Sequence, residues 1–189
     1  MKKDTTQLFL EGMNRVVNVR EYENRSIAED VVEGLLYSFS LGPSSANCQP
    51  WELFIPREEA QLEKIVQATL DPFLTEKSYG AQGWISKAPF VAIVLMEKRR
   101  SQTRIGEKGD RFAAEDIFSA IQNFRLIADT HDLATSVVRE FDPLRLNESL
   151  ELPWYVEPLA ILTAGYTQAE LEIPERLQIN DFVHWGRWQ

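Results

Sequence analysis

The sequence predicts one compact domain of the α/β or α+β class, in which a mixed sheet lies between helices. Segments with the period of an amphipathic helix alternate along the chain with short apolar runs that are typical of strands. The length of 189 residues and the hydrophobic fraction of 44% suit a single globular core. We find no internal repeat, low-complexity tract or linker that would divide the chain.

The first part of the chain is expected to form helices around one strand. We predict a helix over 5–17, then a second that begins at a capping box, Ser26-Ile27-Ala28-Glu29, and stops at Gly42-Pro43. In a capping box, the serine hydroxyl and the glutamate carboxylate satisfy free N–H groups of the first turn. A strand over 51–56 and an amphipathic helix over 57–70 follow.

The second part of the chain continues the alternation. Residues 89–96 form a continuous apolar run, which predicts a strand buried on both faces. A long, largely buried helix is predicted over 110–130, after a polar loop over 106–110. The last elements expected are a strand over 135–141, a short helix over 143–150 and a strand over 157–166.

The C-terminal stretch, residues 171–189, is aromatic but has no clear period. Phe182, Trp185 and Trp188 need a surface on which to pack, and a partner subunit would supply one. The whole chain has 5 Trp and 10 Phe, which indicates extra apolar surface around a planar ligand or at a subunit interface. Ordinary core packing is the alternative explanation.

Composition excludes several classes of partner. Asp and Glu number 29 against 20 Lys and Arg, and the net charge of −9 opposes binding to nucleic acid or to an anionic membrane. The lone cysteine, Cys48, cannot form an intramolecular disulfide and suits a reducing compartment. The apolar run 8–10 is too short for a signal peptide, and no stretch approaches the roughly 20 apolar residues of a membrane span. We therefore expect a cytoplasmic protein.

Common catalytic patterns are missing. The sequence has no P-loop, no glycine-rich dinucleotide fingerprint after a strand, no His-Glu-x-x-His and no Cys-x-x-Cys. His131 and His184 have no second ligand at useful spacing, so we expect no metal site. No side chain stands out as a catalytic acid or base.

The most informative segment runs from Leu41 to Trp51. Pro43 and Pro50 enclose a loop of small side chains that can both donate and accept hydrogen bonds: Ser44, Ser45, Asn47 and Gln49. Such a loop suits a polar heterocycle with carbonyls and ring nitrogens along one edge. A simple turn is the alternative, because serine and asparagine favour turns.

A second segment is basic. Asn18, Arg20 and Arg25, with Arg15 nearby, lie where the first helix ends. Arginine binds phosphate through parallel charge-assisted hydrogen bonds. Alternatively, these are surface charges near a helix C-terminus, where the helix dipole also favours them.

Together these segments resemble the nitroreductase family of flavoproteins. The resemblance rests on Asn18-Val19-Arg20-Glu21-Tyr22, followed by Pro43-Ser44-Ser45-Ala46-Asn47-Cys48-Gln49-Pro50-Trp51. The resemblance spans the chain from about residue 17 to its end. Further matching segments are Ala88-Pro89, Gln122-Asn123, Leu152-Pro153, Gly165-Tyr166, Arg176-Leu177 and Asp181-Phe182-Val183.

The resemblance implies an α+β, nitroreductase-like fold with a mostly antiparallel central sheet flanked by helices. It also implies an intertwined homodimer with FMN at the subunit interface. Arg20 and Arg176 would hold the FMN phosphate, and Asn18 would take the place of a family serine. The other subunit would contact the flavin through Pro43, Ser44, Ser45 and Asn47. The implied activity is electron transfer from NADH or NADPH to a small acceptor such as a nitroaromatic or a quinone, with the flavin carrying the chemistry.

The chain departs from the family pattern at two places. Val16 stands where the family usually has its first phosphate-binding arginine, so Arg15 is a candidate substitute. Arg139 and Glu140 align with the pair whose backbone N–H group faces flavin N5. A side chain in place of the usual glycine changes access there.

Residues 71–87 match the family poorly and are predicted to form a lid that selects the substrate. The candidate lid residues are Phe73, Tyr79, Gln82 and Trp84. Packing of the three aromatic rings into the core is the alternative.

Three other functions remain open at this point. One is a specialised flavoenzyme of the same fold, such as a biosynthetic dehydrogenase or a flavin-fragmenting enzyme. Another is a non-catalytic flavin-binding protein. The third is a thiol enzyme that uses Cys48, but Cys48 follows a helix end, where nothing obvious lowers its pKa.

Overall fold

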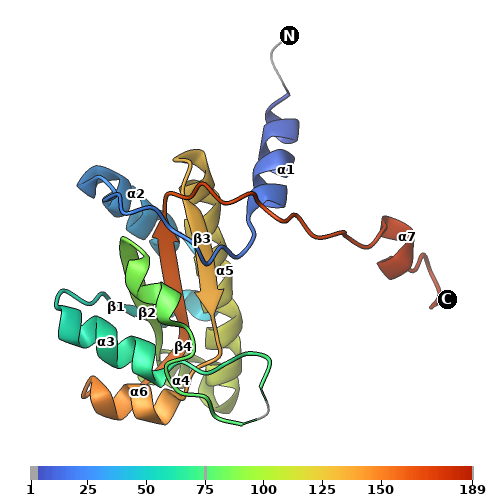
Figure 1. Ribbon diagram of the computed structural model, residues 1–189. Coiled ribbons are helices and arrows are strands. Elements are labelled where there is room, and N and C mark those ends of the chain that lie inside the picture. Colours follow the sequence, from blue (N-terminus) through green and yellow to red (C-terminus); the bar gives the residue numbers. More distant parts are fainter. Residues whose placement is uncertain (1–3, 75, 189) are drawn as a thin grey trace.

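The computed structural model describes residues 4–74 and 76–188 as a helix-flanked sheet with a long C-terminal arm (Figure 1). Thr75 and Gln189, which belong to the predicted lid and tail, lie outside the described residues, as do residues 1–3. The strands are β1 (Trp51–Phe54), β2 (Phe90–Glu97), β3 (Ala134–Val138) and β4 (Val156–Gly165). The helices are α1 (Thr5–Arg15), α2 (Glu29–Ser40), α3 (Glu59–Ala68), α4 (Lys98–Ile105), α5 (Gly109–Thr130), α6 (Pro143–Ser149) and α7 (Ile179–Phe182). Short 3₁₀ turns are η1 (Ser45–Asn47), η2 (Gly83–Lys87) and η3 (Gly106–Lys108).

The sheet has the order β1-β2-β4-β3, and each of these neighbouring pairs is antiparallel. The prediction of a mixed sheet, which came from the alternation of helices and strands, is therefore wrong. The α+β fold with a mostly antiparallel sheet, which the family resemblance implied, is confirmed. Alternation does not fix strand direction, because a connection that contains a helix can still return to the end of the sheet at which it started. The segment between β1 and β2 does so through α3 and the return segment that contains η2.

Strand β2 is buried on both faces, as its continuous apolar run predicted. Its even-numbered side chains, Phe90 to Met96, pack in one cluster with residues of α2 and α5. The odd-numbered ones, Val91 to Leu95, pack in a second cluster with residues of α3 and α6. Figure 1 shows α5 on one side of the sheet and α3 and α6 on the other. The sheet is thus the middle layer of three.

The start of α2 differs from the prediction. The helix begins at Glu29 behind Ala28, which makes no side-chain cap, so the capping box at Ser26 is not formed. Residues before the helix are held in an extended path instead. The backbone N–H of Glu23 donates to the carbonyl of Tyr166, and the guanidinium of Arg25 lies 3.6 Å from the centre of the Tyr166 ring. These tertiary contacts outweigh the local capping preference.

The predicted end of α2 is confirmed, and Gly42 has a further role there. A Cβ atom at Gly42 would lie 2.6 Å from the Cβ of Ala120, so glycine allows α2 to end directly against α5. Helix α5 itself spans nearly the predicted range, and Phe124, Ile117 and Ala120 are fully buried on it. This contact fixes where the loop after α2 leaves the core.

Helix α4 was not predicted, and residues 106–110 are not simply a polar loop. They contain η3 and the first residues of α5. The sequence of α4, Lys-Arg-Arg-Ser-Gln-Thr-Arg-Ile, has no apolar period that would reveal it. A cap and one close contact hold it. The carboxylate of Glu97 accepts from Arg99 N–H, and a Cβ atom at Gly109 would lie 2.7 Å from the carbonyl carbon of Ser101.

The other predicted elements are confirmed with small shifts of their ends. They correspond to α1, β1, α3, α6 and β4. Strand β3 is shorter than predicted, because residues 139–141 leave the sheet and Phe141 instead pairs with Thr69. That departure opens the edge of the sheet beside β3.

Beyond Tyr166 the chain leaves the body as an arm that carries α7 and ends far from the sheet (Figure 1). Trp185 and Trp188 are 79% and 86% exposed, and Phe182 is exposed too. Among the described residues, no helix has the length and apolar character needed to cross a membrane.

Candidate functional site

A cavity of about 630 Å³ lies between the segment that follows α1 and the base of the C-terminal arm. It brings together Asn18, Arg20 and Arg176, which the sequence placed in one site although they come from opposite ends of the chain. We call it the arginine cavity. Its full lining is Val16, Val17, Asn18, Val19, Arg20, Glu21, Arg125, Ala169, Glu170, Leu171, Glu172, Pro174 and Arg176.

Asn18 is held in place by the edge of the sheet. Residues 18 and 135 form a parallel bridge, in which the N–H of Val19 donates to the carbonyl of Thr135 at 3.0 Å. The Asn18 side-chain oxygen accepts hydrogen bonds from Arg125 Nη2 at 3.0 Å and from the backbone N–H of Val137 at 3.2 Å. The oxygen is therefore occupied, whereas the side-chain NH₂ group remains a donor for a ligand.

Arg125 is a residue of this cavity that the sequence analysis missed. It lies on α5 and is half-buried. Its Nε donates to Thr135 Oγ1 at 3.0 Å, and burial lowers the pKa of its guanidinium. A signal was present in the sequence: a charged residue directly follows the buried Phe124 within the apolar pattern of this helix.

Arg15, the suggested substitute for the arginine missing at Val16, is already engaged. Its Nε and Nη2 donate to the two carboxylate oxygens of Asp129 at 2.9 and 2.6 Å. These bonds raise the pKa of Arg15. Val16 lines the arginine cavity and Arg15 does not.

A smaller cavity of about 160 Å³ adjoins the first along the open edge of β3. Asn18 and Arg20 line both cavities, and Gln82, Arg139 and Glu140 line the smaller one. Apart from bonds within the sheet, no hydrogen bond among the described residues engages the backbone N–H of Arg139 or Glu140. The Glu140 carbonyl, in contrast, accepts from Leu70 N–H at 2.8 Å. The candidate backbone donors thus lie beside the candidate phosphate ligands.

The four candidate lid residues have different environments. Phe73 is 84% exposed, whereas Gln82 is 4% exposed and its NH₂ group donates to the carbonyls of Leu70 and Glu140. The hydroxyl of Tyr79 donates to Asp142 at 2.8 Å. Trp84 packs against the core cluster of α3 and α6, with its ring centre 6.3 Å from that of Tyr22. Of the four, the lining of the small cavity includes Gln82 alone.

The loop that follows α2 has a strained backbone. Ala46, Asn47 and Gln49 have φ values of 52°, 49° and 46°, which side-chain-bearing residues rarely adopt. Such strain persists only where the surroundings enforce it, and it clusters at functional sites. Arg104 Nη1 donates to the Ala46 carbonyl at 2.9 Å, and Asp116 accepts from the backbone N–H of Ser45 at 2.7 Å.

Two side chains that the sequence proposed for ligand contact are partly used within this loop. Ser44 Oγ accepts from the backbone N–H of Gln49, and Asn47 Oδ1 accepts from Gln49 Nε2. Cys48 is buried, and that burial, together with the nearby Asp116 carboxylate, raises the pKa of its thiol. A raised pKa is opposite to what a thiolate nucleophile needs.

The loop and the arginine cavity lie on different sides of α5. Ser45 binds Asp116, and Asn18 binds Arg125, two and a half helical turns further along. Half a turn places the two side chains on opposite sides of the helix, and the rise between them is about 14 Å. Pro43, Ser44, Ser45 and Asn47 therefore do not join the arginine cavity within one chain.

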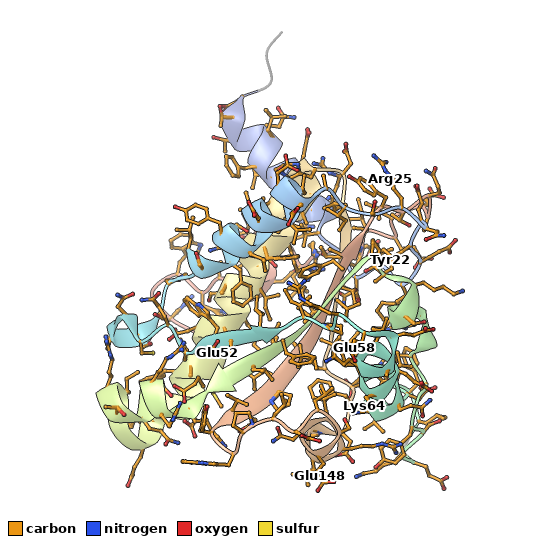
Figure 2. All side chains as sticks on the ribbon, turned by 90° about the vertical axis from the view of Figure 1, so that its left-hand side faces the viewer. Tyr22, Arg25, Glu52, Glu58, Lys64 and Glu148 are labelled. Carbon is orange, nitrogen blue, oxygen red and sulfur yellow. The ribbon has the colours of Figure 1, made fainter. Side chains whose placement is uncertain are left out.

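Figure 2 shows the side chains from the side of the molecule that lies on the left in Figure 1. Tyr22 and Arg25 lie on the same side in this view, on the segment that leads from the arginine cavity to α2. Tyr22 is buried, its hydroxyl lies 2.7 Å from Thr163 Oγ1, and burial raises its pKa to about 12. Burial and the contact with Thr163 therefore give this phenol a structural role.

Comparison with known proteins adds to this geometry. The sequence model of the nitroreductase family matches residues 18–166. An Archaeoglobus fulgidus protein named "Putative NADH dehydrogenase/NAD(P)H nitroreductase" is 33% identical over 179 residues, which cover 90% of this chain and 93% of that protein.

Solved structures share the fold. A nitroreductase family protein of Clostridium difficile has a TM-score of 0.78 at 24% identity, with 95% of this chain and 98% of that chain covered. The NADPH:FMN oxidoreductase of Vibrio harveyi, solved in complex with NAD⁺, has a TM-score of 0.82 at 16% identity, with 96% and 78% covered. The match of the family model over most of the chain and the shared fold lead to one conclusion: this protein belongs to the nitroreductase family.

Proposed function

We propose that this protein is a cytoplasmic, FMN-dependent oxidoreductase that transfers electrons from NADH or NADPH to a small acceptor such as a nitroaromatic or a quinone. The observation that carries the proposal is the convergence of Asn18, Arg20 and Arg176 on one cavity beside the open edge of β3. Membership of an oxidoreductase family supports the reaction class.

The residues present fit FMN. The arginine cavity, at about 630 Å³, falls within the 300–1,000 Å³ that is usual for small-molecule sites. Arginines suit a phosphate because their planar guanidinium groups donate two parallel hydrogen bonds. Glu21, Glu170 and Glu172 also line the cavity, but they are exposed and can turn to solvent.

Each group has a definite task in this proposal. Arg20 and Arg176 neutralise the phosphate, and the Asn18 NH₂ group donates a hydrogen bond beside them. The backbone N–H groups of Arg139 and Glu140, which line the smaller cavity beside β3, would donate to the flavin ring system. Bound FMN supplies the two-electron chemistry, and the protein supplies orientation and hydrogen bonds. No side-chain acid or base is required.

We further propose that the active form is an intertwined homodimer. The loop of Pro43, Ser44, Ser45 and Asn47 is on the far side of α5 from the arginine cavity of its own chain. If the loop contacts the flavin, it must contact the flavin of a second copy. The exposed aromatic side chains of the arm would pack against that second copy.

The test is spectroscopic. Purified protein should be yellow and should bleach when NADH or NADPH is added under nitrogen, after which a panel of acceptors restores the colour at different rates. Arg20→Ala should weaken FMN binding by about 2–3 kcal/mol, the scale of a lost charge-assisted contact. Arg57→Ala, at an exposed position outside both cavities, is the matched control.

Several outcomes would contradict the proposal. Colourless protein that does not bind added FMN contradicts the cofactor. Yellow protein that neither nicotinamide reduces is a flavin-binding protein without this activity. Yellow protein that is reduced but transfers electrons to no nitroaromatic or quinone is a specialised flavoenzyme. Unchanged FMN affinity in Arg20→Ala would remove Arg20 from the site.

A further inference from the structure

Arg125 is a cation without a counter-charge. It is half-buried on α5, and its hydrogen-bond partners are neutral: Thr135 Oγ1 and the Asn18 side-chain oxygen. Among the residues that the structure describes, it forms no ion pair. Taking a charge out of water without a partner is costly, so buried charges are normally paired. An unpaired one indicates an anion that arrives from outside.

The surroundings show where that anion would be. Arg125 lines the arginine cavity together with Arg20 and Arg176. Two of its five N–H donors are used by Thr135 and Asn18, and these bonds fix the plane of the guanidinium. No hydrogen bond to a described residue engages its other three donors. Arg125 is therefore a pre-organised part of the cavity wall.

None of the neighbouring carboxylates in the described part of the chain forms an ion pair with the Arg125 guanidinium. Asp129, one turn further along α5, is held by both hydrogen bonds from Arg15. Asp132 lines a separate cavity of about 250 Å³, which Arg125 and Asp129 also line, yet it forms no ion pair with Arg125. Glu21, Glu170 and Glu172 are exposed and make no ion pair with it either.

We propose that Arg125 is a direct phosphate ligand of this protein and supplies the positive charge that Val16 lacks. The inference rests on the proposed function, since the phosphate in question is that of FMN. Through its bond to Asn18, Arg125 also fixes the direction of the Asn18 NH₂ group. One side chain thus binds the anion and positions a second ligand.

The experiment compares two flavins that differ only in the phosphate. Apoprotein is titrated with FMN and with riboflavin, and binding is followed by quenching of flavin fluorescence. Arg125→Met should weaken FMN binding about 10- to 100-fold and leave riboflavin binding unchanged. Arg125→Lys keeps the charge but loses the planar fork, so its FMN affinity should fall between those of wild type and Arg125→Met.

The control variant is Arg111→Met, on the same helix. Arg111 is exposed and, within the described part of the chain, pairs only with Glu115 one turn away, so its loss should change neither affinity. Thermal unfolding of each apoprotein establishes that the variants fold. If Arg125→Met does not fold, the comparison of FMN and riboflavin is made on Arg125→Lys.

The outcomes separate this inference from the proposed function. Wild-type apoprotein that binds no FMN contradicts the proposed function. Tight FMN binding by wild type and by Arg125→Met alike overturns only the role of Arg125. An equal loss of FMN and riboflavin affinity would also overturn it, because a phosphate ligand cannot affect riboflavin. In that case Arg125 acts through Asn18 and the edge of β3.

Discussion

Large apolar side chains form a buried core in the body of the molecule and are exposed in its C-terminal arm. In the body, the side chains of β2 are buried on both faces of the sheet. In the arm, Leu177, Phe182, Trp185 and Trp188 are all exposed (Figure 1). Fully burying a large apolar side chain stabilises a protein by about 1.5–3 kcal/mol, so the arm forgoes several such contributions. The body buries its apolar core within one chain, whereas these side chains of the arm are exposed, which favours the homodimer proposed above.

The cavity joins these two regions. Its floor, with Asn18 and Arg125, belongs to the body, while Arg176 belongs to the arm. Any partner that fixes the arm therefore also fixes one wall of the proposed phosphate site. This links assembly to cofactor binding, and the following experiments test the link.

Removing residues 182–189 should have the largest effect. The deletion takes away Phe182, Trp185 and Trp188 but leaves Arg176 in place. We expect monomer, aggregate or loss of flavin, because the apolar contacts of the arm are gone. Light scattering measures the assembly state, and absorbance measures the flavin content.

Arg187→Ala is the control for that deletion, since it changes the same segment without removing an apolar side chain. It should leave the assembly state as it is. A truncated protein that stays dimeric and yellow would contradict the role given to the arm.

Within the body, Trp84→Ala should cause the next largest effect. Trp84 packs on Tyr22 and the cluster of α3 and α6, so its loss should cost about 3 kcal/mol of unfolding free energy. Activity toward all acceptors should then fall alike. Phe73→Ala, at an exposed position, should change stability by less than about 0.5 kcal/mol.

Thermal unfolding and kcat/KM for several acceptors measure both effects. An unchanged melting temperature with a new order of acceptors in Trp84→Ala would mean that this ring selects the substrate. The same result in Phe73→Ala would assign that selection to the exposed ring instead.

The smallest effect is expected at Asp142, where the proposed lid meets α6. Hydrogen bonds from Tyr79 and Lys77 lower the pKa of this carboxyl group, and the carboxylate also caps α6. A group whose pKa is lowered by folding stabilises the protein above its ordinary pKa of about 3.9. That contribution is lost as the pH falls through the folded-state value.

Asp142→Asn should therefore be less stable than wild type at neutral pH by about 1 kcal/mol, and the difference should narrow below about pH 4. Chemical unfolding at a series of pH values measures it. Glu148→Gln, an exposed carboxylate on the same helix (Figure 2), should show a smaller difference. A gap between wild type and Asp142→Asn that does not depend on pH would show that the charge is irrelevant.

The sequence pattern predicted an element correctly where buried apolar residues recur at a regular spacing along that element. The apolar run of β2 and the period of α5 each identify an element from its own residues, because each buries a continuous face. The prediction failed at α4, whose residues are polar and whose position depends on the contact between Ser101 and Gly109. It failed again at Ser26, where contacts to Tyr166 keep the chain extended.

The sequence by itself determined most elements of the body, with α4 as the exception, the family, and the two segments that led to the proposed flavin site. Only the tertiary structure decided strand direction, the pairing of Arg15 with Asp129, and the place of Arg125 beside Asn18. It also placed the loop of Ser45 across α5 from the arginine cavity. The physical reason is the separation along the chain of the residues that interact. Periodicity records which face of one element is buried, whereas a counter-ion or a strand neighbour comes from residues far away along the chain.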